Sequence, residues 1–547
     1  MNPVIASEFH AYPLLIGKLL VNTRLTHADS EIVSAGLARY TYGDFLERVE
    51  RLAAGLARLG IRRGDTVAVM NWDCHRYLEC FFAVPMMGAV LHTINIRYSP
   101  EQILYTINHA EDDAILVHED FVPLLDEISA GIVRPTRRVL IQDGPSPPEA
   151  LPDGYDIEYE SILKSGDEGY AFEDFDESTI ATTFYTSGTT GSPKGVFYSH
   201  RQLVLHTLGA LSALSSIEHE VRLHRGDVYM PMTPLFHAHG WGMPYVATLL
   251  GLKQVYARRY DPSRLIACIV GEGATFSHCV PTILHMMLSA PEAASADLSS
   301  LKVLIGGSAM PYGLAHMAVE MGVQVFTAYG LSETCPFLTF ADIRRPGPAG
   351  AGEPEIRSRL KTGKPVPLAE VRVVDEHMND LPAGERHTGE VVVRAPWLTP
   401  GYTDNRDGSE ALWQGGYLHT GDIGYLDESG SLQITDRLKD VIKSGGEWIS
   451  SIALESIISR HEGIDEVAVI GIPDPRWGER PMAIAVRNDP SVDEQCIRSR
   501  VAAEVDLGKL PKWAIPDRVV FVESIDKTSV GKLDKKRLRT RYSADSE

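Results

Sequence analysis

The decisive stretch of this sequence reads Tyr185-Thr186-Ser187-Gly188-Thr189-Thr190-Gly191-Ser192-Pro193-Lys194-Gly195-Val196. Glycine loses much entropy in a helix or strand, and Ser and Thr compete for backbone hydrogen bonds, so regular structure is unfavourable here. Free backbone N–H groups, hydroxyl donors and an ammonium group are the groups that bind phosphates. The stretch therefore predicts a phosphate-binding loop. The alternative, a flexible linker, is disfavoured by the apolar runs that flank it at 181–185 and 196–198.

Two common nucleotide motifs do not describe this loop. A Walker loop ends in Gly-Lys-Ser/Thr, whereas Lys194 follows a proline and precedes a glycine. A dinucleotide fingerprint needs three glycines after a strand, and Gly271 and Gly273 lack the third. The loop therefore indicates a different kind of phosphate site.

Length and composition bound the class of protein. A chain of 547 residues is too long for one core, so two or more domains are expected. Its 44% hydrophobic and 23% charged residues are typical of a soluble globular protein, and the net charge of −21 argues against a nucleic-acid partner. Six scattered cysteines indicate neither a disulfide framework nor a zinc site. Because no stretch reaches the roughly 18 apolar residues of a membrane span, we expect no integral membrane segment and a cytoplasmic location.

Helices and strands are predicted to alternate along most of the chain. Apolar residues at helical spacing predict a helix over 43–59, and strands are predicted at Thr66–Met70 and Ala114–Val117. The same rhythm recurs as far as Val323–Phe326. Such alternation implies crossover units and an α/β fold with mostly parallel sheets covered by helices. Residues 141–178, rich in Gly, Pro and acids, predict a surface connection between subdomains.

The pattern changes after Gly363. Short alternating strands such as Glu370–Val374 predict a small β-barrel-like subdomain. The composition shifts again at Asp436–Asp440, where a compact α+β unit begins. We therefore expect a large N-terminal domain of residues 1–436 and a small C-terminal domain of residues 437–547.

The loop resembles the phosphate loop of the adenylate-forming superfamily, which contains acyl-CoA synthetases, luciferases and peptide-synthetase adenylation domains. The resemblance spans nearly the whole chain, because further motifs follow in that family's order. They are Gly306-Gly307-Ser308-Ala309, Tyr329-Gly330-Leu331-Ser332-Glu333-Thr334, His419-Thr420-Gly421-Asp422 and Thr528-Ser529-Val530-Gly531-Lys532. The resemblance implies an enzyme that uses ATP and Mg²⁺, with CoA as co-substrate.

The resemblance also assigns an ATP site. It implies that Tyr329 stacks on adenine, that Asp422 accepts both ribose hydroxyls and that Arg437 supports the same ribose. Glu333 and Thr186 would hold Mg²⁺, since a carboxylate and a hydroxyl suit this hard cation. The other residues expected to contact ATP or CoA are Ser187, Gly188, Thr189, Thr190, Lys194, Gly307, Ser308, Thr327, Ala328, Gly330, Ser332, Lys439, Lys443 and Trp448.

The segment from Pro234 to Trp241 has two interpretations. The pair His237 and His239 forms His-x-His, a metal-ligand pattern that would indicate a metal-dependent hydrolase. In the family, an aromatic-His segment here borders the acyl pocket and the phosphate site. His237 would then be catalytic and contact substrate, Trp241 would gate the acyl tunnel, and Gly306 and Gly307 would line the substrate site. The role of His239, which replaces a common asparagine, stays open.

The C-terminal motif implies a catalytic lysine. Lys532 would bridge the attacking carboxylate and the α-phosphate, offsetting negative charge as two anions meet. Lys439 stands at the family's hinge, so we expect the small domain to rotate there between two half-reactions and bring the Gly445-Gly446 loop to the active site. Taken singly, Asp422 would be a turn residue and Lys532 a solvated surface charge.

We therefore expect an AMP-forming acid–thiol ligase. Trp241 and the run Gly445-Gly446-Glu447-Trp448-Ile449-Ser450 resemble enzymes of medium- and long-chain fatty acids. An aryl- or other small-acid CoA ligase, the metal hydrolase and a nucleotide-binding protein without catalysis are the alternatives. The partners are a small carboxylic acid, ATP and CoA, and a homodimer is expected from related enzymes. The acyl chain length depends on how side chains pack in the tunnel.

Overall fold

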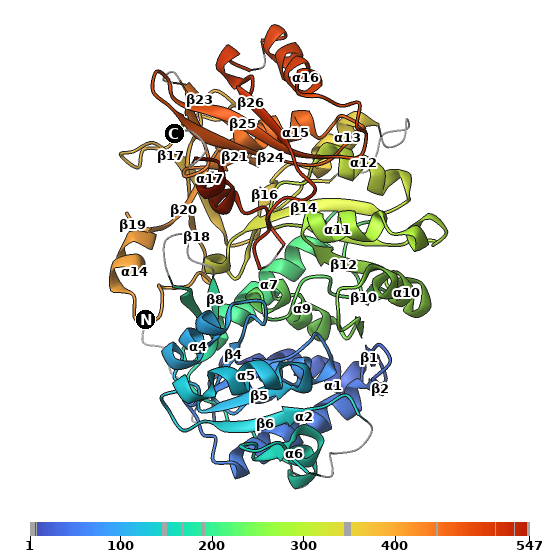
Figure 1. Ribbon diagram of the computed structural model, residues 1–547. Coiled ribbons are helices and arrows are strands. Elements are labelled where there is room, and N and C mark those ends of the chain that lie inside the picture. The colour runs from blue at the N-terminus through green and yellow to red at the C-terminus, as the bar shows by residue number, and fades with distance from the viewer. Residues whose placement is uncertain are drawn as a thin grey trace.

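The computed structural model describes residue 6 and residues 8–144, 150–166, 169–186, 192–343, 352–444, 447–508, 510–529 and 531–543. The expected α/β fold is confirmed: two helix-covered, largely parallel sheets form a large domain, and a small α+β domain follows at the C-terminal end (Figure 1). Within these residues, no helix is both long and apolar enough to cross a membrane.

The first large sheet of the described chain has seven strands in the order β7-β6-β5-β3-β4-β8-β9. All neighbours are parallel except β8 and β9, which flank the phosphate loop. The bounds are β3 Thr66–Met70, β4 Val90–Thr93, β5 Ala114–His118, β6 Arg137–Ile141, β7 Ile157–Glu158, β8 Ile180–Thr186 and β9 Lys194–Ser199.

The second large sheet has nine described strands in the order β16-β15-β14-β13-β12-β10-β11-β1-β2. Its centre is parallel, and antiparallel pairs close both edges. The bounds are β1 Glu31–Ser34, β2 Ala38–Thr41, β10 Val228–Tyr229, β11 Lys253–Tyr256, β12 Phe276–Cys279, β13 Lys302–Ile305, β14 Gln324–Gly330, β15 Phe337–Phe340 and β16 Lys364–Pro365.

Local sequence sets where the covering helices begin. The helix α4 starts after Ser99, whose hydroxyl accepts from the Gln102 N–H while the Gln102 side chain accepts from the Ser99 N–H, with Pro100 in the first helical position. The principal helices of the large domain are α2 Tyr42–Arg58, α3 His75–Met86, α4 Pro100–His109, α6 Tyr159–Ser165, α7 His200–Ser215, α9 Met243–Leu250, α10 Pro262–Glu272, α11 Pro281–Leu288 and α12 Tyr312–Glu320.

The prediction of a surface connection over residues 141–178 is wrong for part of that segment. Strand β7 extends the seven-stranded sheet, and α6 packs against α2. The contact is close, since a Cβ on Gly55 would lie 2.5 Å from the Ile162 carbonyl oxygen. Tyr159 and Ile162 are fully buried. The polar composition of the segment's ends concealed this short apolar helix.

The expected small β subdomain is an antiparallel sheet of five described strands. Strand β20 pairs with β18, β19 and β21, and β18 also pairs with β17. The bounds are β17 Glu370–Val374, β18 Gly389–Arg394, β19 Trp413–Gln414, β20 Tyr417–Leu426 and β21 Leu432–Arg437.

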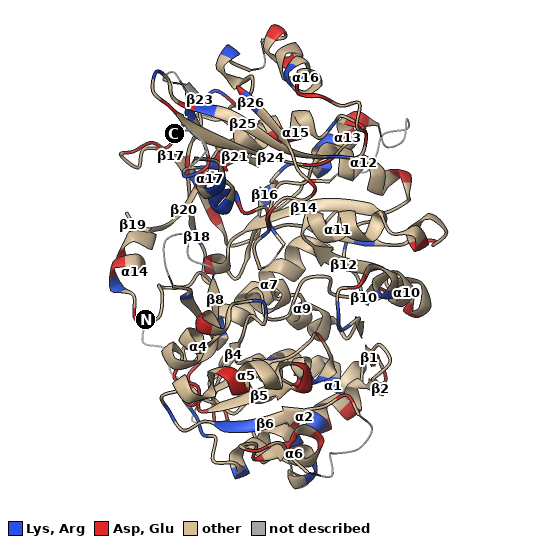
Figure 2. Cartoon of the chain, in the orientation of Figure 1, with Lys and Arg blue, Asp and Glu red and all other residues tan. Residues whose placement is uncertain are grey.

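The C-terminal α+β domain has its own sheet and core. Strand β25 pairs with β22, β24 and β26, and β22 also pairs with β23. Basic residues gather on α17 (Figure 2), where Lys535 pairs with Glu455 and Arg539 with Asp440. The bounds are β22 Ile442–Ser444, β23 Glu447–Ile449, α15 Ser451–Ile458, β24 Ile464–Asp474, β25 Gly478–Arg487, α16 Glu494–Asp506, β26 Arg518–Phe521 and α17 Lys535–Ser543.

Candidate functional site

A buried carboxylate, Asp422, lies at the centre of the candidate site. Asp422 on β20 and Arg437 on β21 are direct partners in the antiparallel pair, and Arg437 Nε lies 3.2 Å from Asp422 Oδ1. The Tyr329 hydroxyl donates to Asp422 Oδ2 at 2.7 Å. Burial raises the pKa of Asp422, and Arg437 and Tyr329 oppose that rise. Each carboxylate oxygen can accept more than one hydrogen bond, so Asp422 fits a ligand with two neighbouring hydroxyls such as a ribose.

Lys532, from the far end of the chain, lies close enough to this carboxylate for each charge to act on the pKa of the other. Its side chain packs against Gly307, where a Cβ would lie 3.1 Å from Lys532 Cε, and Gly307 has a φ of +81° that favours glycine. Burial and the Arg437 charge lower the pKa of Lys532 to about 8, whereas Asp422 and Glu333 act to raise it. Lys532 is thus mainly a cation at neutral pH, and the charges of both acids favour that form.

Tyr402, which the sequence did not single out, connects the acid Glu333 to the phosphate loop. Its hydroxyl donates to Glu333 Oε1 at 2.7 Å, and Lys194 Nζ lies 4.6 Å from the centre of its ring. Lys194 faces Thr186 directly across the β8–β9 pair. Tyr402 was missed because nothing around Pro400-Gly401-Tyr402 distinguishes it from an ordinary loop aromatic.

The two side chains predicted to hold Mg²⁺ have suitable ligand atoms. A Glu333 carboxylate and a Thr186 hydroxyl are oxygen ligands, which this hard cation prefers. The other predicted loop residues, Ser187, Gly188, Thr189 and Thr190, lie outside the described residues.

A left-handed turn positions the histidine segment. Residues Ala238 to Gly242 all have φ between +46° and +70°. A non-glycine residue in this conformation costs roughly 1–2 kcal/mol, so the surrounding packing must hold the turn in place. Trp241 is buried, and a Cβ on Gly306 would lie 3.1 Å from its ring. His237, just before the turn, has its pKa lowered to about 3 by burial and by the Lys532 charge, so its imidazole is neutral.

The metal-hydrolase interpretation lacks a ligand set. Among the described residues, the only group of three His, Cys, Asp or Glu side chains with converging ligand atoms is His118, Glu119 and Asp143. His239 instead packs edge-on against the rings of Phe81, Phe184 and Tyr198. Its burial lowers its pKa to about 3.

Several other residues that were predicted to contact the nucleotide stabilise the local fold in this structure. The Thr327 hydroxyl donates to the carbonyls of Arg359 and Lys361, so it holds that segment in place. A Cβ on Gly330 would lie 1.7 Å from the Pro336 carbonyl oxygen, so only glycine fits there. The remaining members of this set are Ala328, which pairs with Phe340, Ser332, whose carbonyl accepts from Tyr198, and Ser308, which is exposed.

Residues of the small domain divide into two groups. Lys439 lies near the site, since its charge acts on the pKa of both Asp422 and Lys532. Lys443 lies over the exposed Trp448 ring on the β22–β23 hairpin, with Nζ 5.4 Å from the ring centre. The Trp448 side chain is 53% exposed to solvent, so it remains available for a ligand.

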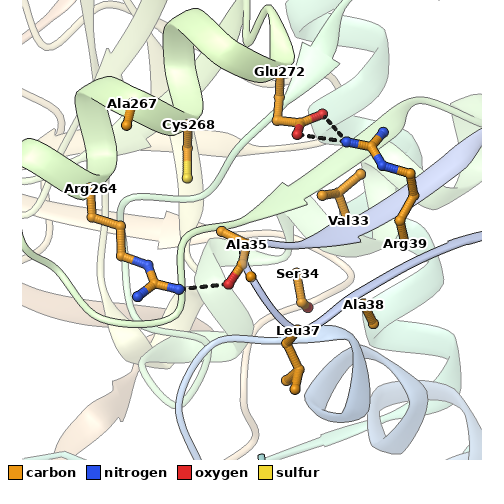
Figure 3. Close-up of a pocket in the computed structure, with 11 residues that line it drawn as sticks. Val33, Ser34, Ala35, Leu37, Ala38, Arg39, Arg264, Ala267, Cys268 and Glu272 are labelled. Carbon is orange, nitrogen blue, oxygen red and sulfur yellow. Dashed lines mark hydrogen bonds and ion pairs between the residues drawn. The ribbon is translucent and has the colours of Figure 1, made fainter. Parts of the chain in front are cut away.

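A hollow of about 530 Å³ lies elsewhere, between α10 and the β1–β2 hairpin (Figure 3). Arg39 donates to both carboxylate oxygens of Glu272, and Arg264 donates to the Ala35 carbonyl. This hollow contains none of the predicted site residues and borders the opposite edge of the nine-stranded sheet from β14.

Comparison with known proteins confirms the resemblance. A family model described as AMP-binding enzyme matches residues 22–403, and one described as AMP-binding enzyme C-terminal domain matches residues 453–532.

Several relatives extend over nearly the whole chain. A long-chain-fatty-acid–CoA ligase of Thermus thermophilus is 40% identical over 94% of this chain and 92% of its own. A 3-methylmercaptopropionyl-CoA ligase of Ruegeria lacuscaerulensis is 36% identical over 97% of each chain, and a medium-chain-fatty-acid–CoA ligase of Ectopseudomonas oleovorans is 34% identical over 97% and 96%. The solved structure of a Mycobacterium tuberculosis fatty acyl CoA synthetase, 26% identical, superposes with a TM-score of 0.69 over 97% of this chain and 99% of its own.

We predict that Lys532 titrates well below an ordinary lysine. Its ammonium should lose its proton near pH 8, compared with about 10.4 for a free lysine, because burial disfavours the charged form. NMR of the ¹³C-dimethylated protein measures this, with Lys532→Ala assigning the signal. Asp422→Asn should lower the value further, since the carboxylate favours the ammonium. An unshifted value, or a rise in Asp422→Asn, would contradict the geometry.

Proposed function

Since this chain belongs to the family of AMP-binding enzymes, we propose that the acid it activates is a medium- or long-chain fatty acid. The chain is an ATP-dependent acyl-CoA ligase. It forms an acyl-adenylate and pyrophosphate, and CoA then displaces AMP to give the acyl-CoA. The observation that supports a hydrophobic acid is the buried Trp241 ring, which lies along Gly306 and beside Phe337 at the carboxyl end of β13.

In the first half-reaction, a carboxylate oxygen attacks the α-phosphorus of ATP. The bond to the bridging oxygen breaks, and pyrophosphate leaves with the electron pair. We assign Lys532 to this step, since a cation against Gly307 would lower the repulsion between carboxylate and phosphate. Asp422 would hold the ribose and Tyr329 the adenine. His237 is neutral and lies near Lys532, so it would donate a hydrogen bond without adding charge.

The phosphate end of the site would be held by the β8–β9 loop. Lys194 would bind the β- and γ-phosphates together with the loop's hydroxyls and N–H groups. Glu333 and Thr186 would hold Mg²⁺, which when bound neutralises charge on the pyrophosphate. The Tyr402 hydroxyl would orient Glu333 for this task.

The second half-reaction would need a different face of the small domain. Lys532 packs against Gly307, which supports assigning this structure to the adenylation state. We propose that residues 437–547 rotate about Lys439 so that the hairpin with Lys443 and Trp448 reaches the site for CoA. The six free cysteines support a reducing, cytoplasmic location, and a homodimer stays a prediction.

The proposed substrate is tested with a panel of acids. Enzyme, ATP, Mg²⁺ and CoA are mixed with straight-chain acids of increasing length, aryl acids and 3-methylmercaptopropionate, and the release of AMP and the acyl-CoA product are measured. We expect the highest kcat/KM for a medium- or long-chain acid, and a changed chain-length profile in Trp241→Ala. A preference for an aryl acid or the thioether acid would overturn the proposed substrate. AMP without a thioester would overturn the ligase assignment.

The two half-reactions should depend differently on Lys532. We expect Lys532→Ala to slow pyrophosphate release about 100-fold or more, because it removes a charge that acts in the transition state. Thioester formation from supplied acyl-adenylate should remain. The matched control is Lys536→Ala, which removes an exposed lysine from α17. Equal loss in both half-reactions would contradict this division of labour.

A further inference from the structure

The turn that carries Lys532 is fastened to the large domain by three side chains. Asn95 Nδ2 donates to Ser529 Oγ at 3.0 Å, and an Arg97 Nη1–H donates to the Ser529 carbonyl at 3.0 Å. Thr282 Oγ1 donates to the Gly531 carbonyl at 2.7 Å. All three bonds cross between the domains, and they lie one to three residues before the lysine.

Asn95 is oriented before it meets the turn. It follows β4, is only 7% exposed, and its Oδ1 accepts the Arg97 backbone N–H at 3.0 Å. With the oxygen occupied by the chain's own backbone, the amide presents Nδ2 outward to Ser529. A buried amide donor without a hydrogen-bond partner is unfavourable. Ser529 supplies that partner to Asn95 when the turn packs against the large domain.

Thr282 holds the other side of the same turn. It lies in the first turn of α11, beyond the carboxyl end of β12. Gly531 has a φ of +82°, and a Cβ there would lie 3.2 Å from Thr282 Oγ1. Glycine is therefore needed both for the backbone conformation and for the close approach of this hydroxyl.

The turn also stiffens itself. The Thr528 N–H donates to the Lys532 carbonyl, and the Gly531 N–H donates to the Thr528 carbonyl, at 2.7 and 2.9 Å. The Thr528 hydroxyl accepts the Lys532 N–H at 3.2 Å. Fastening Ser529 and Gly531 to the large domain thus sets the position of the lysine as well.

We propose that Asn95, Arg97 and Thr282 form a latch that recognises Ser529 and Gly531 and thereby positions Lys532 for the adenylation half-reaction. The three latch side chains are positioning residues, because they contact the turn. The proposal rests on the proposed function for its catalytic consequence. Rotation of the small domain would break all three bonds, so the latch favours the adenylation state and is not needed for thioester formation.

A double-mutant cycle between Asn95 and Ser529 tests the latch. Asn95→Ala and Ser529→Ala should each slow pyrophosphate release about 3- to 10-fold, the effect of one hydrogen bond, and leave thioester formation from acyl-adenylate unchanged. The double variant should be no slower than the slower single variant, because both remove the same bond. Asn108→Ala is the matched control, since the half-buried Asn108 side chain bonds only within the large domain, to the Gly131 carbonyl through Nδ2 and to the Val133 N–H through Oδ1.

Hydrogen exchange gives a readout without substrate. In both single variants, exchange of the Gly531 and Lys532 amides should rise about 3- to 10-fold, while amides in β25 stay protected. Three results would overturn the latch. They are rate losses of the two single variants that multiply in the double variant, equal slowing of both half-reactions, and unchanged exchange of the Gly531 and Lys532 amides. If unmutated enzyme releases no pyrophosphate with any acid, the proposed function fails, and the exchange result still decides the latch. Ser529→Ala leaves the large domain intact should Asn95→Ala fold poorly.

Discussion

The buried Asp422 carboxylate is the group on which the rest of the site depends. It is held between Arg437 and the Tyr329 hydroxyl. Its charge also favours the ammonium form of Lys532, which belongs to the small domain. A carboxylate removed from water is costly unless hydrogen bonds and opposite charges compensate it. The compensation here comes from three separate parts of the chain. One acid therefore draws together β14, the β20–β21 pair and the C-terminal turn.

This arrangement leaves several cations close together. Burial, together with the charges of Arg437 and Lys439, lowers the pKa of Lys532. An incoming triphosphate and carboxylate would supply the missing negative charge. The site is thus electrostatically suited to anionic substrates, while the chain as a whole carries a net charge of −21.

The domain interface adds a mechanical condition. Lys532 sits on a short turn whose position is set by hydrogen bonds to the large domain, and only one of these, from Arg97, uses an exposed residue. A few such bonds are strong enough to favour one orientation and weak enough to break in each catalytic cycle. That balance would suit the proposed rotation, in which one small domain serves two steps.

Residue chemistry and periodicity were enough to predict the alternating α/β core. The strand predicted at Thr66–Met70 has the same bounds as β3. The candidate roles of Asp422, Glu333 and Lys532 came instead from the resemblance of their motifs to the adenylate-forming superfamily, because taken singly each would be an ordinary residue. Local sequence patterns did not predict features that depend on packing between distant segments of the chain. The left-handed turn of residues 238–242 contains non-glycine residues that would rarely adopt this conformation alone. Tyr402 is an ordinary loop aromatic in the sequence, and only the fold places Glu333 beside it. Contacts between residues hundreds of positions apart leave no local pattern, so only the folded chain could identify them.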